Sequence, residues 1–190
     1  MKRAIILHGM PSEAEYYNAD RDSQSNSHWL PWLQQQLCVH SIVAQTPEMP
    51  TPYAPDYQAW CGEFEQYTID KNTLLVGHSW GGYFLLRWLT ENPDRIVGKV
   101  VLVAAWLDME KEYGDLYNMP LPADLSQRVV GGIEYLYSTN DAVSMQTTLH
   151  YVKATVENVK YHEFVNYGHF TFKHMKTHEF PELLAICLAE

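Results

Sequence analysis

The sequence predicts an α/β fold, in which a parallel sheet lies between two layers of helices. Short apolar, β-branched runs recur along the chain, and amphipathic helical patterns fill most of the gaps between them. Strands that alternate with helices in this way form a parallel sheet covered on both faces. A length of 190 residues fits one domain, and a hydrophobic content of 46% is enough for a substantial core. We therefore expect a single domain over residues 1–190.

Six runs are short and apolar enough to be strands buried on both faces of a sheet. They are residues 4–7, 39–44, 73–77, 100–105, 132–137 and 159–165. Helical stripes of apolar residues lie at 29–37, 57–67, 83–89, 145–156 and 183–188. Pro31 and Pro181 are expected in first helical turns, where their missing N–H costs nothing, and Asp56 is a candidate N-cap.

Two polar, irregular segments interrupt this alternation. Residues 107–130, "LDMEKEYGDLYNMPLPADLSQRVV", mix charges, aromatic residues and prolines and are expected to form a small cap over a pocket. Residues 11–27 are similarly irregular. Both follow predicted strands, and ligand sites in such folds lie beyond the carboxyl ends of the strands. We therefore expect both segments near the functional site.

Composition excludes several classes of partner. A net charge of −10 argues against binding to nucleic acid and against docking on an anionic membrane. Cys38, Cys61 and Cys187 are far apart and are expected to be free thiols in a reducing compartment. The start "MKRAIILHGM" is too short for a signal-peptide core, and no run reaches transmembrane length. A cytoplasmic location is the expectation.

Ser79 is the candidate nucleophile. It lies in "GHSWG", residues 77–81, which matches G-x-S-x-G between a predicted buried strand and an apolar helix. In such a strand–turn–helix elbow, glycines let neighbouring backbone approach, and the turn lifts Oγ clear of the sheet. The helix start directs N–H groups toward a developing oxyanion. The backbone N–H groups of Trp80 and Met10 are the candidate oxyanion donors, and His8 frames the loop that carries Met10.

His169 is the candidate base, because it follows the last predicted strand in "VNYGHF". A tight turn at Gly168 would place it at the carboxyl end of the sheet, and the order Ser, acid, His fits an elbow enzyme. His28, His40, His150 and His162 are expected to be structural or solvated, and the side chain of His78 is expected to point away from that of Ser79. His174 and His178 are spaced i, i+4 but lack the glutamate of H-E-x-x-H, so a solvated helix face is expected rather than a metal site.

Asp141 and Asp108 compete as the acid that orients the base. Asp141 ends the strand before that of His169, in the turn-rich "YSTND". Asp108 follows the preceding strand in "AAWLDME", where some hydrolases place the acid. We favour Asp141, since a turn at a strand end can aim a carboxylate into the site. The neighbouring Asn140 has the wrong chemistry for this role.

Taken together, "HWLPWL", "LLVGHSWGG", "VVLVAAW", "YSTND" and "NYGHF" resemble the α/β-hydrolase superfamily. The chain is most similar to its small single-domain serine hydrolases, which include retinoblastoma-binding protein 9 and YdeN-like proteins. The resemblance implies a triad of Ser79, Asp141 and His169. It also implies a reduced α/β-hydrolase fold with about six parallel strands in the order 2-1-3-4-5-6. Trp80 stands where relatives often have a small residue, so its ring is expected to narrow the pocket.

The leading hypothesis is a serine hydrolase that cleaves a small ester, thioester or amide through an acyl-enzyme intermediate. No metal or organic cofactor is expected. A small acyl compound is the expected partner, and the sequence contains no motif for a protein partner. An apolar acyl pocket is expected from His8, Trp106, Leu107 and Phe170. Two alternatives remain open: a protein-interaction module with a vestigial hydrolase site, and acyl transfer to an acceptor other than water.

Overall fold

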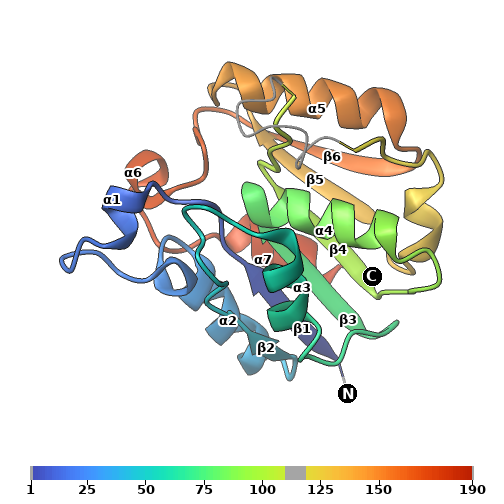
Figure 1. The fold of residues 1–190 in the computed structure, drawn as a ribbon, viewed down its shortest axis with the longest axis horizontal. Helices are drawn as coiled ribbons and strands as arrows, with labels where there is room; N and C mark the ends of the chain where they lie inside the picture. The colour runs from blue at the N-terminus through green and yellow to red at the C-terminus, as the bar shows by residue number, and fades with distance from the viewer. Residues whose placement is uncertain (1, 110–118, 190) are drawn as a thin grey trace.

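The computed structural model describes residues 2–109 and 119–189. Six parallel strands form a sheet in the order β2-β1-β3-β4-β5-β6 (Figure 1). The strands are β1 (Arg3–Leu7), β2 (Val43–Gln45), β3 (Thr73–His78), β4 (Lys99–Val103), β5 (Ile133–Ser138) and β6 (Val159–Phe164). The predicted α/β class and the strand order implied by the resemblance are both confirmed.

The centre of the sheet is more deeply buried than its edges. Leu75 of β3 pairs with Ile5 of β1 on one side and with Val100 of β4 on the other. All of β3 and β4 is buried. In β2 only the middle residue is buried, and every residue of β6 retains some exposure. Burial on both faces is therefore correct for the central strands and wrong for the two edge strands, which have a neighbour on one side alone.

The strand predicted over residues 39–44 starts too early. Val39 is the last residue of helix α2 (Leu30–Val39), and β2 begins only at Val43. The N–H of His40 still donates to the carbonyl of Gln36 at 3.1 Å, so helical hydrogen bonding continues past Val39. A short apolar, β-branched run looks the same at a helix end as at a strand start, which explains the error.

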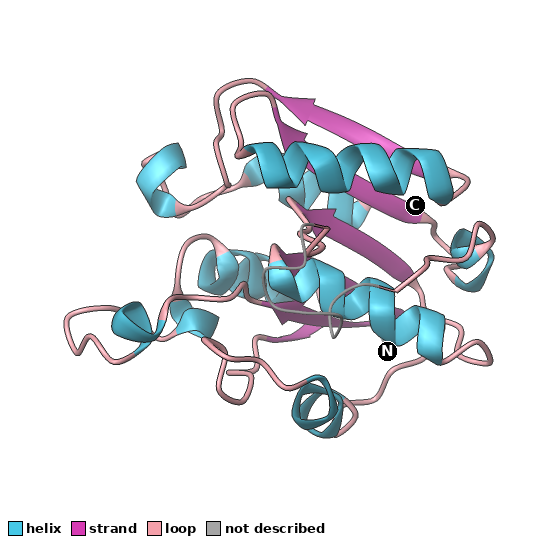
Figure 2. Ribbon diagram, turned by 45° about the horizontal axis from the view of Figure 1, so that its top comes forward, coloured by secondary structure: helices cyan, strands magenta, loops and turns pink. Residues whose placement is uncertain are grey.

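Helices cover both faces of the sheet (Figure 2). One core lies between the sheet and helices α3 (Tyr57–Phe64), α4 (Trp80–Glu91) and α5 (Val143–Thr155). The other core lies between the opposite face and helices α2 and α7 (Pro181–Leu188). In Figure 1, α4 and α5 lie in front of the sheet and α7 lies behind it. The shorter elements are α1 (Glu13–Tyr16), α6 (Phe172–Met175) and the 3-10 helices η1 (Gln24–Asn26) and η3 (Leu125–Arg128).

The predicted helix starts are confirmed. Pro31 and Pro181 each lie in the first turn of a helix, α2 and α7. Asp56 caps α3, because its carboxylate accepts a 2.7 Å hydrogen bond from the N–H of Ala59. Such a cap contributes about 1 kcal/mol to the stability of a helix.

The segment expected to form a cap, residues 107–130, is described only in part, because residues 110–118 lie outside the described residues. The part of the segment after the gap, residues 119–130, packs against the rest of the domain. Leu121 and Leu125 are buried in the core beside α4, and the Arg128 guanidinium donates to the carbonyl of Leu89 at 2.8 Å. Leu89 is near the C-terminal end of α4, whereas Ser79 precedes its first residue. Residues 119–130 therefore lie at the helix end that is remote from Ser79.

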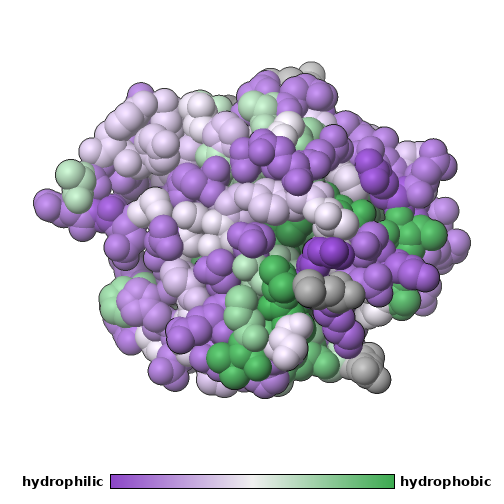
Figure 3. All heavy atoms as spheres, turned by 90° about the horizontal axis from the view of Figure 1, so that it is seen from below, coloured by the Kyte–Doolittle hydropathy of each residue, from purple (hydrophilic) through white to green (hydrophobic). Residues whose placement is uncertain are grey.

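Figure 3 shows one face on which hydrophilic residues predominate and hydrophobic residues gather in a few patches. Within residues 2–109 and 119–189, no helix has both the length and the apolar character needed to cross a membrane.

Candidate active site

Ser79 occupies a strained turn between β3 and α4. Its backbone angles, φ 51° and ψ −117°, lie in a region that non-glycine residues rarely adopt. The end of β4 holds this turn in place. The Ser79 N–H donates to the carbonyl of Val103 at 2.9 Å, and the Trp106 N–H donates to the carbonyl of Ser79 at 3.2 Å. The predicted strand–turn–helix context of Ser79 is thus present.

The glycines around Ser79 are needed because backbone approaches them closely. A Cβ added at Gly77 would lie 2.7 Å from the backbone of Gly81 and Gly82. At Gly81 it would lie 2.6 Å from the carbonyl oxygen of His8, and at Gly82 2.6 Å from the Cβ of Ala105. Real Cβ atoms are essentially never this close to other heavy atoms. The turn is therefore wedged between the ends of β1 and β4.

The loop after β1 runs directly against Ser79. A Cβ added at Gly9 would lie 3.1 Å from the Cβ of Ser79. The next residue, Met10, lines the same cleft as Ser79. On the other side of Ser79, helix α4 begins at Trp80, and the N–H groups of a first helical turn point out of the helix end. Both candidate oxyanion donors therefore belong to backbone next to Ser79, while their role stays a prediction.

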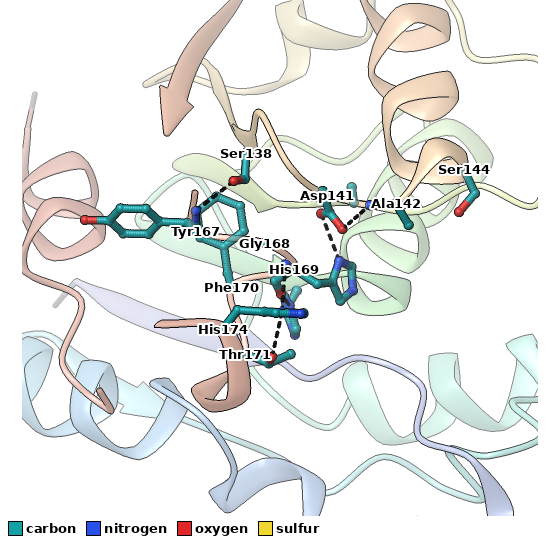
Figure 4. A network of polar contacts seen from close by, with 12 residues as sticks. Ser138, Asp141, Ala142, Ser144, Tyr167, Gly168, His169, Phe170, Thr171 and His174 are labelled. Atoms are coloured by element: carbon teal, nitrogen blue, oxygen red, sulfur yellow. Dashed lines mark hydrogen bonds and ion pairs between the residues drawn. The ribbon is translucent and has the colours of Figure 1, made fainter. Parts of the chain in front are cut away.

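Asp141 contacts His169, as the sequence led us to expect (Figure 4). Oδ2 of Asp141 accepts a 3.0 Å hydrogen bond from Nδ1 of His169, and its Oδ1 accepts a 2.7 Å bond from the N–H of Ala142. The Asp141 side chain is 4% exposed and that of His169 is 23% exposed. Because a carboxylate accepts, Nδ1 of His169 carries the hydrogen, and Nε2 is left as the basic nitrogen.

Asn140 and Ser138 fasten the loop that carries His169. Oδ1 of Asn140 accepts from the N–H of Gly168 and from the hydroxyl of Ser138, each at 2.8 Å. Oγ of Ser138 in turn accepts from the N–H of Tyr167 at 2.9 Å. This role of Asn140 is not among the predictions from the sequence, in which Asn140 figures only as an unsuitable acid. The turn-rich "STND" was the available signal, since Ser and Asn side chains commonly bond to nearby backbone.

Ser79 and His169 line one cleft of about 540 Å³, which we call the Ser79 cleft. Residues from the irregular segment 11–27 form one part of its wall, and the chain after β6 forms another. Its lining is mostly polar or charged and consists of Gly9, Met10, Pro11, Glu15, Asp20, Arg21, Asp22, Gln24, Ser27, His28, His78, Ser79, His169, Thr171, Phe172, Lys173, His174 and His178.

A second, smaller hollow of about 250 Å³ adjoins the start of α5, and we call it the Trp106 hollow. It is lined by Trp106, Leu107, Asp108, Met109, Val143, Ser144 and Thr147. Trp106 connects it to the candidate nucleophile, because its N–H donates to the carbonyl of Ser79. Two of the residues expected in an apolar pocket, Trp106 and Leu107, thus lie together here. Asp108, the competing acid, is buried in the same hollow.

Three expectations about the pocket are wrong. Phe170 has no exposed area, because its φ of 51° turns the ring into the core, where it stacks on Phe180 at 5.6 Å. His8 is 1% exposed, and its Nε2 accepts from the N–H of Met49 at 2.9 Å. The ring of Trp80 is 1% exposed and packs in the core beside α3, so it does not narrow the Ser79 cleft.

Two histidines near His169, the buried His78 and the partly buried His28, are held in the neutral form. Burial, followed by the proximity of His169 and His28, lowers the pKa of His78 well below its usual value. Nε2 of His78 donates to the carbonyl of His169 at 2.9 Å. The pKa of His28 is lowered to about 4 by burial and by nearby His169 and His178. Its Nδ1 accepts from the N–H of Phe172 at 3.3 Å, which requires an unprotonated nitrogen.

His174 and His178 do not share a helix face. Helix α6 ends at Met175, and Lys176 takes a left-handed conformation with φ 58°. Nδ1 of His174 lies 3.0 Å from the N–H of His169, whereas Nδ1 of His178 donates to the carbonyl of His28 at 2.6 Å. The expected helix face is thus wrong, whereas both residues are exposed, as expected, and line the Ser79 cleft. Among the described residues, no group of three or more potential ligands could hold a metal ion.

The strand order, the helical layers and the turn at Ser79 define an α/β-hydrolase fold. The sequence model of one family, serine hydrolase, matches residues 20–181. The chain belongs to the serine hydrolase family.

The chain is also similar to individual members of this fold. It is 32% identical to YdeN of Bacillus subtilis (strain 168) over 108 residues, which cover 55% of this chain and 51% of YdeN. This alignment spans about half the length of that relative. The crystal structure of YdeN matches 98% of this chain and 96% of its own, with 22% identity and a TM-score of 0.74. The YdeN-like part of the resemblance is confirmed, and the comparison with retinoblastoma-binding protein 9 stays a prediction.

Two further solved structures share the fold at lower identity. A YdeN-like protein of Pectobacterium atrosepticum matches 98% of this chain and 89% of its own, with 16% identity and a TM-score of 0.66. A monoacylglycerol lipase of Paleococcus ferrophilus matches 97% of this chain and 92% of its own, with 12% identity and a TM-score of 0.60. At these identities the likeness establishes the fold alone.

Proposed function

We propose that this serine hydrolase acts through Ser79, His169 and Asp141 and cleaves a small ester, thioester or amide. The observation that carries the proposal is the 3.0 Å bond between Asp141 and His169, whose ring lines the same cleft as Ser79. An acid that holds Nδ1–H of a histidine beside a strained serine is the arrangement required for acyl transfer.

In this mechanism Nε2 of His169 takes the proton of the Ser79 hydroxyl as Oγ attacks the substrate carbonyl carbon. Asp141 fixes the tautomer of His169 and stabilises the imidazolium that forms. The N–H groups of Trp80 and Met10 would donate to the oxyanion. His169 then returns the proton to the leaving group as its bond to the acyl carbon breaks. A water molecule, deprotonated by His169, releases the acid and regenerates Ser79.

The two hollows favour a substrate with two unlike parts. The many hydrogen-bonding side chains that line the Ser79 cleft suit a leaving group that carries hydrogen-bonding groups. The Trp106 hollow is smaller and contains Trp106, Leu107 and Met109, so it suits a short apolar acyl group. The fold is compatible with ester chemistry, because one solved structure that shares it is named as a monoacylglycerol lipase.

A fluorophosphonate probe and a short-chain p-nitrophenyl ester test the proposal on the whole chain. We expect wild-type protein to be labelled and to hydrolyse the ester, and Ser79→Ala to do neither while it keeps the wild-type circular-dichroism spectrum. Removing the nucleophile should lower kcat by about 10⁶-fold. Folded wild-type protein that takes up no label would contradict the proposal. It would favour the reading as an interaction module with a vestigial site.

A further inference from the structure

The loop that carries His169 adopts an unusual backbone conformation. Asn166, Gly168 and Phe170 all have positive φ angles, of 66°, 54° and 51°. Non-glycine residues in this region are uncommon and persist only where surrounding contacts hold them. The position of the His169 ring therefore depends on what holds this loop.

Side chains from outside the loop satisfy its successive N–H groups. Ser138 and Asn140 accept from the N–H groups of Tyr167 and Gly168, as described above. The N–H of His169 itself donates to Nδ1 of His174 at 3.0 Å. The loop is thus held from the β5 side by Asn140 and from the α6 side by His174.

The ring of His174 is fixed by two further contacts. The hydroxyl of Thr171 lies 3.0 Å from Nδ1 of His174 (Figure 4). A Cβ added at Gly168 would lie 2.5 Å from Cγ of His174, so the ring packs directly on this glycine. Since Nδ1 accepts from the His169 N–H, the hydrogen of the ring is on Nε2. His174 therefore presents one defined acceptor to the backbone of His169.

We propose that His174 is a positioning residue for His169, and the proposal rests on the function proposed above. By accepting from the His169 N–H, it holds the backbone so that Nδ1 of His169 stays on Asp141 and Nε2 stays directed to the Ser79 cleft. His174 itself need not touch substrate. A misplacement of about 1 Å in a catalytic group can cost about 10²-fold in rate, so loss of this acceptor should be measurable.

Three substitutions of His174 distinguish a positioning role from the mere loss of a polar side chain or of the fold. Oδ1 of asparagine is as many bonds from Cβ as Nδ1 of histidine, so His174→Asn can restore the acceptor. His174→Gln carries the same amide one bond too far, and His174→Ala removes it. With a p-nitrophenyl ester, we expect alanine and glutamine to lower kcat by about 10- to 100-fold with KM changed by less than about twofold. The kcat of His174→Asn should stay within about threefold of the wild-type value.

His40→Asn is the matched control, because His40 is exposed at the end of α2 and lies outside both hollows. It should leave kcat unchanged. A His174→Ala enzyme that keeps kcat within about twofold of wild type would overturn the proposal. So would a folded His174→Asn enzyme that is no faster than His174→Gln.

A second readout does not depend on catalysis. The proton shared by Nδ1 of His169 and Asp141 gives a far-downfield NMR signal when the pair is ordered. We expect this signal in wild type and in His174→Asn, and its broadening or loss in His174→Ala. If wild type hydrolyses no ester, the proposed function fails while this signal still decides the role of His174. An unchanged signal in His174→Ala would refute the positioning role.

Discussion

The backbone around Ser79 and the loop that carries His169, the two sides of the candidate site, are held by different kinds of contact. On the Ser79 side, backbone packs on backbone, and Gly77, Gly81 and Gly82 leave no room for a side chain. On the His169 side, side-chain acceptors from separate segments, Asn140 and His174 among them, bond to the N–H groups of an irregular loop. Ser79 is thus fixed by close backbone packing together with backbone hydrogen bonds to the end of β4, whereas the His169 loop depends on side-chain hydrogen bonds.

This difference predicts how each side fails. A side chain added at Gly77, Gly81 or Gly82 fits only if the backbone shifts, so substitutions of these glycines should act mainly on stability. Hydrogen bonds can be removed one at a time, each at a net cost of about 1 kcal/mol. Substitutions on the His169 side should therefore change activity or pH dependence before they unfold the protein.

Apart from removal of the nucleophile itself, the largest expected effect is on the His169 side. Asp141→Asn should lower kcat by about 10⁴-fold, equivalent to about 5.5 kcal/mol in the barrier, because an amide does not stabilise the protonated ring. Steady-state kinetics on a p-nitrophenyl ester measures it. Asp108→Asn is the comparison variant, because Asp108 is the competing candidate for the acid; we expect it to cost much less than Asp141→Asn. Loss of activity only in Asp108→Asn would make Asp108 the acid.

The second effect tests the steric side. Gly81→Ala should lower the free energy of unfolding by about 3 kcal/mol, because the new Cβ meets the carbonyl oxygens of His8 and Leu7 at 2.6 and 2.8 Å. This cost exceeds the helical gain of alanine over glycine, which is about 1 kcal/mol. Urea unfolding measures the difference.

Gly62→Ala is the control for this substitution. Gly62 also lies in a helix, α3, but a Cβ added there has nothing within 4 Å. The same change should therefore raise stability by about 1 kcal/mol. Equal effects at both glycines would show that close approach does not set the requirement at Gly81.

The smallest expected effect concerns acid stability on the His169 side. The folded-state pKa of His28 is lowered to about 4, mainly by burial, whereas an unfolded histidine titrates near its usual value of about 6.5. As the pH falls through this window, the unfolded chain binds the proton first, so stability is lost. The contribution of His28 between pH 7 and pH 5 is about 2 kcal/mol.

His28→Asn should reduce the loss of stability between pH 7 and pH 5 by this amount. Asparagine tolerates the φ of 58° at this position and keeps an acceptor for the Phe172 N–H. Urea unfolding at several pH values measures the slope. His150→Asn, at an exposed position on α5, should keep the wild-type slope. A His28→Asn protein with that same slope would contradict the assignment to His28.

Sequence reasoning succeeded where the determinants are local. The central strands, the helix starts at Pro31 and Pro181 and the glycine-rich turn at Ser79 each follow from a few consecutive residues. It failed where a residue's surroundings come from elsewhere. Phe170 follows the candidate base, but its left-handed backbone places the ring in the core. His174 has the spacing of a helix face with His178, but the helix ends between them.

By itself the sequence determined the α/β class and the strained, glycine-rich turn at Ser79 between a strand and a helix, because period, β-branching and glycine spacing act over short distances. Only the tertiary structure decided which carboxylate meets His169, that Asn140 and His174 accept hydrogen bonds from the backbone of its loop, and that many polar and charged residues line the Ser79 cleft. Those contacts join β5, β6, α6 and the segment after β1. These contacts form because parallel strands bring loops that are remote in the sequence to one edge of the sheet. A local sequence pattern does not predict which residues then meet.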